Sequence, residues 1–308
     1  MRDAFVQELT RLAQQDPRIV FLTADLGYKI FDGFAACCPD RFLNMGVSEA
    51  NMISVAAGLA LGGLHPVAYS IVPFATARCL EQIRNDVCNM NLPVLVVGVG
   101  GGYAYGPNGP THHGVDDVAL MRAMPGMTVL CPCDPLEVRQ LLGQALALPG
   151  PAYLRLGRNR EPILCPPGSP TLLGQPKVLR QGHTVAFIAC GPIAREALAA
   201  ADRLAARGLM PWVVSAHTVK PITGLAAFVR DTRVAHCFVI EEHGPCGSLS
   251  EALAAELADI PERPLLTRLT APDRFLHEAG SQTYLWHLAG IDVDGIVGTV
   301  VGKLGLKP

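Results

Sequence analysis

Short, almost continuously apolar segments recur along the first half of this 308-residue chain and alternate with helical segments. Three of them are IVFLTA (19–24), PVAYSI (66–71) and PVLVVGVGG (93–101). A strand that is apolar on both faces is typical of a parallel sheet covered by helices on both sides. Because intervening segments such as FATARCLEQIRNDVC (74–88) read as amphipathic helices, the pattern predicts an α/β sheet.

The same alternation restarts in the second half of the chain. A segment rich in proline and glycine, 160–176, interrupts it, and the strand TVAFIACG (184–191) follows. We therefore predict a first domain over residues 1–160, a linker over 161–180 and a second, smaller domain over 181–308. The expected fold class is α/β, with two parallel-sheet-rich, three-layer α/β domains in tandem.

The composition argues against several classes of function. Half of the chain is hydrophobic, 17% is charged and the formal net charge is −2. We therefore expect a sizeable core and no basic surface for nucleic acid or an anionic membrane. A helix breaker interrupts every apolar run before the ~20 residues needed to span a bilayer, so no membrane span is expected. The ten cysteines are scattered, which favours reduced thiols and a cytoplasmic location.

Two of these cysteines, Cys131 and Cys133, form a C-x-C pair within LCPCDP. A structural metal site usually combines such a pair with a second pair of cysteines or histidines. The sequence has no second pair nearby, so we expect no metal ligands on this chain.

One stretch, LNMGVSEANMISVAAGLALGG (43–63), contains a single ionisable side chain, Glu49. Its structural interpretation is a helix start, with Ser48 as N-cap and an acid in the first turn that complements the helix dipole. Its functional interpretation is a carboxylate placed in a dry pocket for chemistry. The stretch by itself leaves both interpretations open.

The loop GGGYAYGPNGPTHHGVDD (100–117) follows a predicted strand and is long and glycine-rich. In open α/β sheets, ligands bind beyond the carboxyl ends of the strands, and Glu49, this loop and Arg158 all fall there. His112 and His113 are candidate proton donors or acceptors near neutral pH. The alternative is a turn-rich lid with solvated histidines. The loop matches neither a Walker motif nor a dinucleotide fingerprint, since it does not open a helix.

Taken together, the motifs resemble the second half of a transketolase-type thiamine diphosphate enzyme, over nearly the whole chain. They are TADLG (23–27), NMGVSEANMISVAAGLAL (44–61), GPNGPTHHGVDDVALMRAMPGMTV (106–129), TVAFIACGPIAREALAAADRLAARG (184–208), VKPI (219–222) and IEEHGPCGSLSEAL (240–253). The resemblance implies a pyrimidine-binding domain followed by a transketolase C-terminal-type domain, as in a split transketolase subunit.

The resemblance gives Glu49 a role. In the family, a glutamate at this position hydrogen-bonds N1′ of the cofactor's aminopyrimidine. Thiamine diphosphate reacts after losing its thiazolium C2 proton, and the base is its own 4′-amino group. A carboxyl that shares a proton with N1′ makes that group basic enough, most effectively in a dry pocket. Glu49 is therefore expected to be both catalytic and cofactor-binding.

Three more residues match cofactor-binding positions of the family. Phe74 matches an aromatic residue that packs on the pyrimidine ring, with a core phenylalanine as the alternative. Ile71 falls where a second aromatic residue often sits, so this wall would be aliphatic. Asp25 matches an acid near the cofactor across a subunit interface.

Five residues match substrate positions. His112, also expected to be catalytic, matches a histidine that contacts the donor or the intermediate, and His113 is its neighbour. Arg78 resembles an arginine of the substrate channel in the deoxyxylulose-phosphate synthase branch, although a surface arginine is the alternative. Arg158 matches an arginine that binds the acceptor's phosphate, and Lys29 lies where it would face an anionic tail.

Two departures from the family leave the substrate open. An acid usually precedes the Gly-Pro-Thr-His segment, where this chain has Asn108 at a substrate-binding position. The strand end at 100–102 lacks the histidine or arginine that helps to bind phosphate. The acceptor could therefore be a non-phosphorylated sugar, a sulfonated one or another aldehyde.

The resemblance also implies a partner subunit. Relatives hold the cofactor's diphosphate through Mg²⁺ with a Gly-Asp-Gly segment of another domain, and no GDG occurs in this chain. The metal and diphosphate ligands are thus expected on an N-terminal-half transketolase subunit, in an α2β2 heterotetramer. This chain alone should be inactive.

Three functions are left open. The first is transfer of a two-carbon ketol unit from a ketose donor to an aldehyde acceptor, both small sugar-like substrates. The second starts from a 2-oxo acid, in a decarboxylating carboligase of the deoxyxylulose-phosphate synthase type or a dehydrogenase E1 β-like subunit. The third is a non-catalytic scaffold or regulatory subunit. The intact Glu49 and Thr-His-His segment favour the first two.

Overall fold

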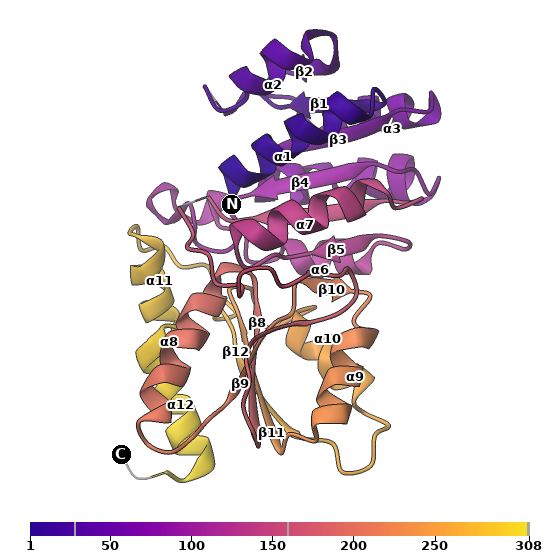
Figure 1. The fold of residues 1–308 in the computed structure, drawn as a ribbon. Helices are drawn as coiled ribbons and strands as arrows, with labels where there is room; N and C mark the ends of the chain where they lie inside the picture. The colour runs from indigo at the N-terminus through magenta and orange to yellow at the C-terminus, as the bar shows by residue number, and fades with distance from the viewer. Residues whose placement is uncertain (28, 159, 307–308) are drawn as a thin grey trace.

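The computed structural model describes residues 1–27, 29–158 and 160–306 and has two α/β domains in tandem, as predicted (Figure 1). The first contains a seven-stranded sheet in the order β10-β5-β6-β4-β3-β1-β2. Its first six strands are β1 (Ile19–Thr23), β2 (Phe42–Asn44), β3 (His65–Ile71), β4 (Leu95–Val99), β5 (Thr128–Leu130) and β6 (Ala152–Leu156). These six are parallel. Every residue of β1, β4 and β6 is buried, because helices cover both faces of the sheet.

The helices of the first domain divide between the two faces (Figure 1). On one face α1 (Arg2–Gln15) packs against α7 (Pro135–Leu146), and α2 (Asp32–Cys37) contacts α1. On the other face α3 (Glu49–Leu61) and α6 (Asp117–Ala123) contribute to a separate apolar cluster. This second cluster continues into the other domain, so the two domains share a core.

The seventh strand of this sheet comes from the second half of the chain. β10 (Thr218–Lys220) pairs antiparallel with β5. Its Val219 is buried in the same cluster as Val129 of β5. A segment that belongs to the second domain by sequence therefore completes the sheet of the first. This pairing fixes one domain against the other close to the carboxyl end of β5.

The second domain has a five-stranded sheet in the order β12-β11-β8-β9-β7. Its strands are β7 (Lys177–Arg180), β8 (Val185–Cys190), β9 (Trp212–Ser215), β11 (His236–Glu241) and β12 (Leu265–Leu269). All pairs are parallel except that of β7 with β9. β7 lies inside the segment that the sequence suggests as a linker. One face of the sheet carries α8 (Ala194–Ala205), α11 (Gln282–Ala289) and α12 (Val293–Leu304), and the other α9 (Thr223–Thr232) and α10 (Leu249–Glu256) (Figure 1).

The prediction of one regular helix over 74–88 is wrong. The chain forms α4 (Val72–Ala75), a 3₁₀ turn at Ala77–Cys79, α5 (Leu80–Gln82) and a π-helical turn at Ile83–Cys88. The hydroxyl of Thr76, between the first two pieces, donates to the carbonyl of Val72 at 2.7 Å. Such a bond competes with the regular helix and bends it, and π-helical turns often mark functional sites.

A C-terminal segment departs from the expectation that no stretch is long and apolar enough to cross a membrane. Gln282–Leu304 meets that length with a mean hydropathy of 1.2. The segment is divided into α11 and α12, and Gly290 between them has φ +69°. Trp286 and Val300 are buried against the second sheet. It is therefore a helical pair of this domain.

Candidate active site

The predicted site residues gather beyond the carboxyl ends of the parallel strands. Glu49 is the first residue of α3, which follows β2. Phe74 lies on α4, directly after β3. His112 ends a 3₁₀ turn in the long loop after β4, and Arg158 follows β6. The sheet order places β3, β4 and β6 side by side, so residues distant in sequence meet at one edge.

Glu49 is a buried carboxylate with two polar partners. Only 3% of the residue is exposed. Ser70, near the end of β3, donates its hydroxyl to Oε1 at 3.1 Å, and Arg78 Nη1 donates to Oε2 at 2.6 Å. Ser48 makes no side-chain capping bond at this helix start. The Glu49 side chain therefore hydrogen-bonds with two neighbouring side chains. A carboxylate that only complements the helix dipole would not need these partners.

Arg78 contacts both Glu49 and Phe74. Its guanidinium carbon is 4.2 Å from the centroid of the Phe74 ring, a cation–π contact, while the same group forms the ion pair with Glu49. The Arg78 side chain is 45% exposed, so it connects the buried carboxylate with solvent. A planar, nitrogen-bearing group thus fits between Glu49 and Phe74.

A row of aromatic rings extends from Phe74 toward a second arginine. The rings of Phe74 and His112 meet edge to face, with centroids 5.1 Å apart, and Tyr105 is 6.1 Å from His112. The guanidinium of Arg158 lies over the Tyr105 ring at 4.3 Å. His112 is therefore placed between two cationic side chains. Its Nδ1 is 3.0 Å from the hydroxyl of Thr111.

His113 points into the protein instead. It is 4% exposed and lies edge to face against Tyr103, with ring centroids 5.2 Å apart. Burial lowers the pKa of His113, because a low-polarity environment disfavours the charged imidazolium. Adjacent histidines in the sequence thus occupy different environments, and a substrate contact by His113 stays a prediction.

The three glycines at the end of β4 make room for the loop. A Cβ on Gly100, which has φ +82°, would lie 2.1 Å from the Tyr105 ring. At Gly102, with φ +63°, it would lie 2.1 Å from the Glu242 carboxyl carbon. Glycine is the residue that tolerates both this backbone conformation and this close approach.

Glu242, which follows β11 of the second domain, holds this loop in place. Its Oε1 accepts a hydrogen bond from Tyr103 N at 2.6 Å, and Gln282 Nε2 donates to both of its oxygens. Arg155 Nη2 donates to the carbonyls of Gly114 and Glu242 at 2.6 and 2.9 Å. Glu242 of the second domain therefore holds the Tyr103 end of the segment that carries His112, and Arg155 of β6 connects its Gly114 end to Glu242.

Glu242 makes stability depend on pH. Burial raises the pKa of Glu242 from 4.5 to about 7, so the folded chain binds a proton that the unfolded chain releases. The free energy of unfolding should fall as pH rises from 4.5 to about 7, by up to about 3 kcal/mol. Denaturant unfolding across this interval should show a smaller slope for Glu242→Gln than for wild type. The exposed control Glu256→Gln should keep the wild-type slope, and equal slopes in all three proteins would contradict the prediction.

The remaining predicted residues also lie at strand ends or in the loop after β4. Ile71 is the half-buried last residue of β3. Asn108 is exposed, and its backbone N–H donates to Tyr105 O at 2.8 Å. Asp25, with φ +49°, bonds through its backbone N–H and carboxylate with Asn44. Asp25 and the exposed Lys29 line one groove at the ends of β1 and β2.

Sequence reasoning missed three contributors to the site. Ser70 sits in an apolar strand and offers no local signal. Tyr105 lies within the glycine-rich loop 100–117 that the sequence indicates as functional. An aromatic residue directly before a glycine in this loop could have marked it as part of the site. Glu242 is one of two adjacent acids directly after an apolar strand, a placement that could have marked it as buried.

Comparison with known families covers both domains. The family described as transketolase, pyrimidine binding domain matches residues 1–162. The family described as transketolase, C-terminal domain matches residues 174–296.

Individual relatives are of two lengths. The 6-deoxy-6-sulfo-D-fructose transketolase subunit SqwH of Clostridium sp. (strain MSTE9) is 37% identical over 96% of this chain and 92% of that protein. The 1-deoxy-D-xylulose-5-phosphate synthase of Thermomicrobium roseum is also 37% identical, over 98% of this chain but 48% of that protein. A solved structure described as a split gene transketolase, inactive beta4 tetramer, superimposes with a TM-score of 0.87 at 32% identity, covering 100% of this chain and 98% of that one.

Proposed function

Because this chain belongs to the transketolase family, we propose that it is one subunit of a split, thiamine diphosphate-dependent transketolase. It would transfer a two-carbon ketol unit from a ketose donor to an aldehyde acceptor. The observation that carries the proposal is the buried Glu49 carboxylate beside Phe74 and His112. The similarity to SqwH, over nearly the full length of both chains, supports a split subunit.

The side chains around Glu49 fit the aminopyrimidine of thiamine diphosphate. The Arg78 guanidinium between Glu49 and Phe74 indicates that a flat group can hydrogen-bond the carboxylate and contact the ring. An aminopyrimidine has the same two requirements: a proton-sharing partner for N1′ and an aromatic face. Glu49 and Phe74 would hold the group, with Ile71 as an aliphatic neighbour. When bound, the cofactor supplies the nucleophilic carbon that takes up the two-carbon unit.

The chain's own side chains would then bind and orient the reactants. Glu49, buried and held by Ser70, keeps a carboxyl oriented toward the pyrimidine and away from water. His112 lies over the Phe74 ring and can donate a proton to a carbonyl oxygen or accept one from a hydroxyl. Arg158 and Arg78, at the two ends of the aromatic row, offer planar cationic groups for an anionic tail such as a phosphate or sulfonate.

We further propose that this activity needs a partner subunit that supplies the diphosphate and Mg²⁺ ligands. Helix α3 supports this, because it is apolar on nearly all sides although only one face is buried. Leu61 at its end is 61% exposed, and Val47 just before it is 78% exposed. Helices that are hydrophobic all round are usually covered. The inactive tetramer of a related split-gene β chain is consistent with this requirement.

The test is a reconstitution. The chain is assayed alone and mixed with a candidate diphosphate-binding subunit, thiamine diphosphate and Mg²⁺, on ketose donors that end in a hydroxyl, a phosphate or a sulfonate. We expect ketol transfer in the mixture and none with either subunit alone. Transfer by the chain alone would contradict the partner requirement. Absence of transfer in a mixture that assembles and binds the cofactor would contradict the reaction.

A second reaction is the alternative, because the deoxyxylulose-phosphate synthase of Thermomicrobium roseum is as similar in sequence to this chain as SqwH is. That alternative starts from a 2-oxo acid. Release of carbon dioxide from pyruvate by the same mixture, without ketol transfer, would favour it. The chain spans about half the length of that synthase.

A further inference from the structure

The structure separates the C-x-C pair and gives each cysteine a different neighbour. The Cys131 thiol lies beside that of Cys190, on β8 of the second domain. The Cys133 thiol lies beside that of Cys165, in the segment between the two sheets. The tertiary structure thus gives each cysteine of the C-x-C pair a second cysteine as neighbour, which the nearby sequence does not contain.

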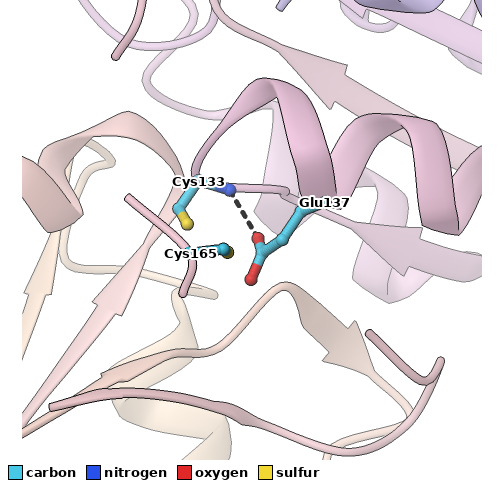
Figure 2. A group of neighbouring side chains, drawn as sticks. All are labelled: Cys133, Glu137 and Cys165. Carbon is cyan, nitrogen blue, oxygen red and sulfur yellow. Dashed lines mark hydrogen bonds between the residues drawn. The ribbon is translucent and has the colours of Figure 1, made fainter. Parts of the chain in front are cut away.

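Cys133 and Cys165 converge on one carboxylate, Glu137, in the first turn of α7 (Figure 2). One ligand atom from each residue, the two Sγ atoms and a carboxylate oxygen, lies within 4.8 Å of the others. Around a tetrahedral Zn²⁺, with Zn–S bonds of about 2.3 Å, neighbouring ligand atoms lie about 3.8 Å apart. The three side chains therefore approach the spacing of a metal site.

The two carboxylate oxygens of Glu137 in this cluster differ in their hydrogen bonding. Its Oε2 accepts hydrogen bonds from Cys133 N at 2.7 Å and from Ser215 Oγ at 3.0 Å. Its Oε1 is buried and has no hydrogen-bond partner among the residues that the structure describes, and Figure 2 shows the Glu137 carboxylate beside Cys165. A buried carboxylate oxygen without a partner is costly, and a cation would satisfy it.

The charges around the cluster also favour a cation. Burial, and after it the nearby carboxylates of Glu137 and Asp134, raise the pKa of the Cys133 thiol. Asp134 itself is held by backbone N–H groups, among them those of Leu164 and Cys165 at 2.8 Å. Thiolate ligands select soft or borderline cations such as Zn²⁺ over Mg²⁺ or Ca²⁺.

We propose that Cys133, Glu137 and Cys165 bind one Zn²⁺ ion, in a site that the sequence alone does not predict. Two thiols lose their protons to solvent as two Zn–S bonds form, and Glu137 Oε1 supplies the third ligand. Two thiolates and one carboxylate leave the site with one net negative charge. A water would complete the tetrahedron.

Such an ion would connect three parts of the fold. Cys133 and Glu137 belong to the start of α7, Cys165 to the interdomain segment, and Ser215, bonded to Glu137, to β9. The three ligands are buried and lie on other elements than Glu49 and His112. The proposal does not depend on the proposed reaction.

The test measures the zinc content of the refolded chain. The chain is unfolded, refolded with Zn²⁺, dialysed against a weak chelator and analysed by mass spectrometry. We expect about one zinc per chain in wild type and at least a fivefold loss in Cys165→Ser, which alters the interdomain segment and leaves α7 intact. The double variant Cys37→Ser/Cys246→Ser, which removes the two exposed thiols, should keep the zinc.

Refolding with Co²⁺ gives an independent readout. A sulfur-to-cobalt charge-transfer band should appear in wild type, weaken in Cys133→Ser and Cys165→Ser, and persist in Cys237→Ser, a buried cysteine elsewhere. Circular dichroism would establish that each variant folds. Wild-type protein that folds without retaining zinc, or zinc that is lost with the exposed cysteines instead, would overturn the proposal.

Discussion

Glu49→Gln is expected to lower ketol transfer by the assembled enzyme about 10²- to 10⁴-fold, the range typical of a lost acid–base group. The substitution keeps the shape of the side chain and still allows hydrogen bonds with Ser70 and Arg78. It removes the ability to share a proton with the pyrimidine. Deuterium exchange at the cofactor's C2 position should slow by a similar factor, and this measurement needs no substrate.

Two controls make this result specific. Glu256→Gln, an exposed acid of α10, should exchange at the wild-type rate. The cofactor dissociation constant of Glu49→Gln should change much less than its rate, because one hydrogen bond contributes only about 1 kcal/mol. Equal exchange in wild type and Glu49→Gln would mean that the carboxylate is a helix-start residue and not catalytic.

Arg78→Gln is expected to tighten cofactor binding, an unusual direction for the loss of a cationic side chain. Arg78 contacts Glu49 and Phe74, the two residues proposed to hold the pyrimidine. The guanidinium must therefore leave before the cofactor enters. If these contacts contribute about 1 kcal/mol, the open form is a minority, and removing them should lower the apparent Kd about fivefold.

The same substitution, Arg78→Gln, should lower the thermal stability of the chain alone. Loss of the Arg78 contacts leaves Glu49 with Ser70 as its remaining polar partner, so the melting temperature should fall by a few degrees. Arg84→Gln, an exposed arginine on the neighbouring π-helical turn, should change neither quantity. A weaker cofactor affinity in Arg78→Gln would show that Arg78 helps to bind the cofactor instead of occupying its place.

The release of Arg78 has a consequence for substrate choice. Once displaced, its guanidinium is free to reach an anionic group in the channel, together with Arg158 over Tyr105. Arg78→Gln should therefore also raise the KM of a phosphorylated or sulfonated substrate relative to a neutral one. Wild type and variant compared on matched substrates would separate this effect from cofactor binding.

The sequence by itself determined most of the strands, most of the helices and the special status of Glu49. These features are local: a strand buried on both faces is recognised from its unbroken apolar run, and a lone acid on an apolar helix is conspicuous because burying a charge is costly. The glycine-rich loop with His112 was recognisable for the same reason, since long loops in compact domains are usually functional.

Only the tertiary structure decided which partners these residues have. Arg78 reaches Glu49 because the segment after β3 bends at Thr76, against the regular helix that its periodicity predicts. Tyr103 and Glu242 are bonded across 139 positions, and β10 joins the first sheet from the second domain. Cys133, just before α7, and Cys165, in the interdomain segment, likewise come together only in the folded chain. Local periodicity records which face of an element is buried, whereas these contacts depend on how two domains pack, and no local pattern carries that information.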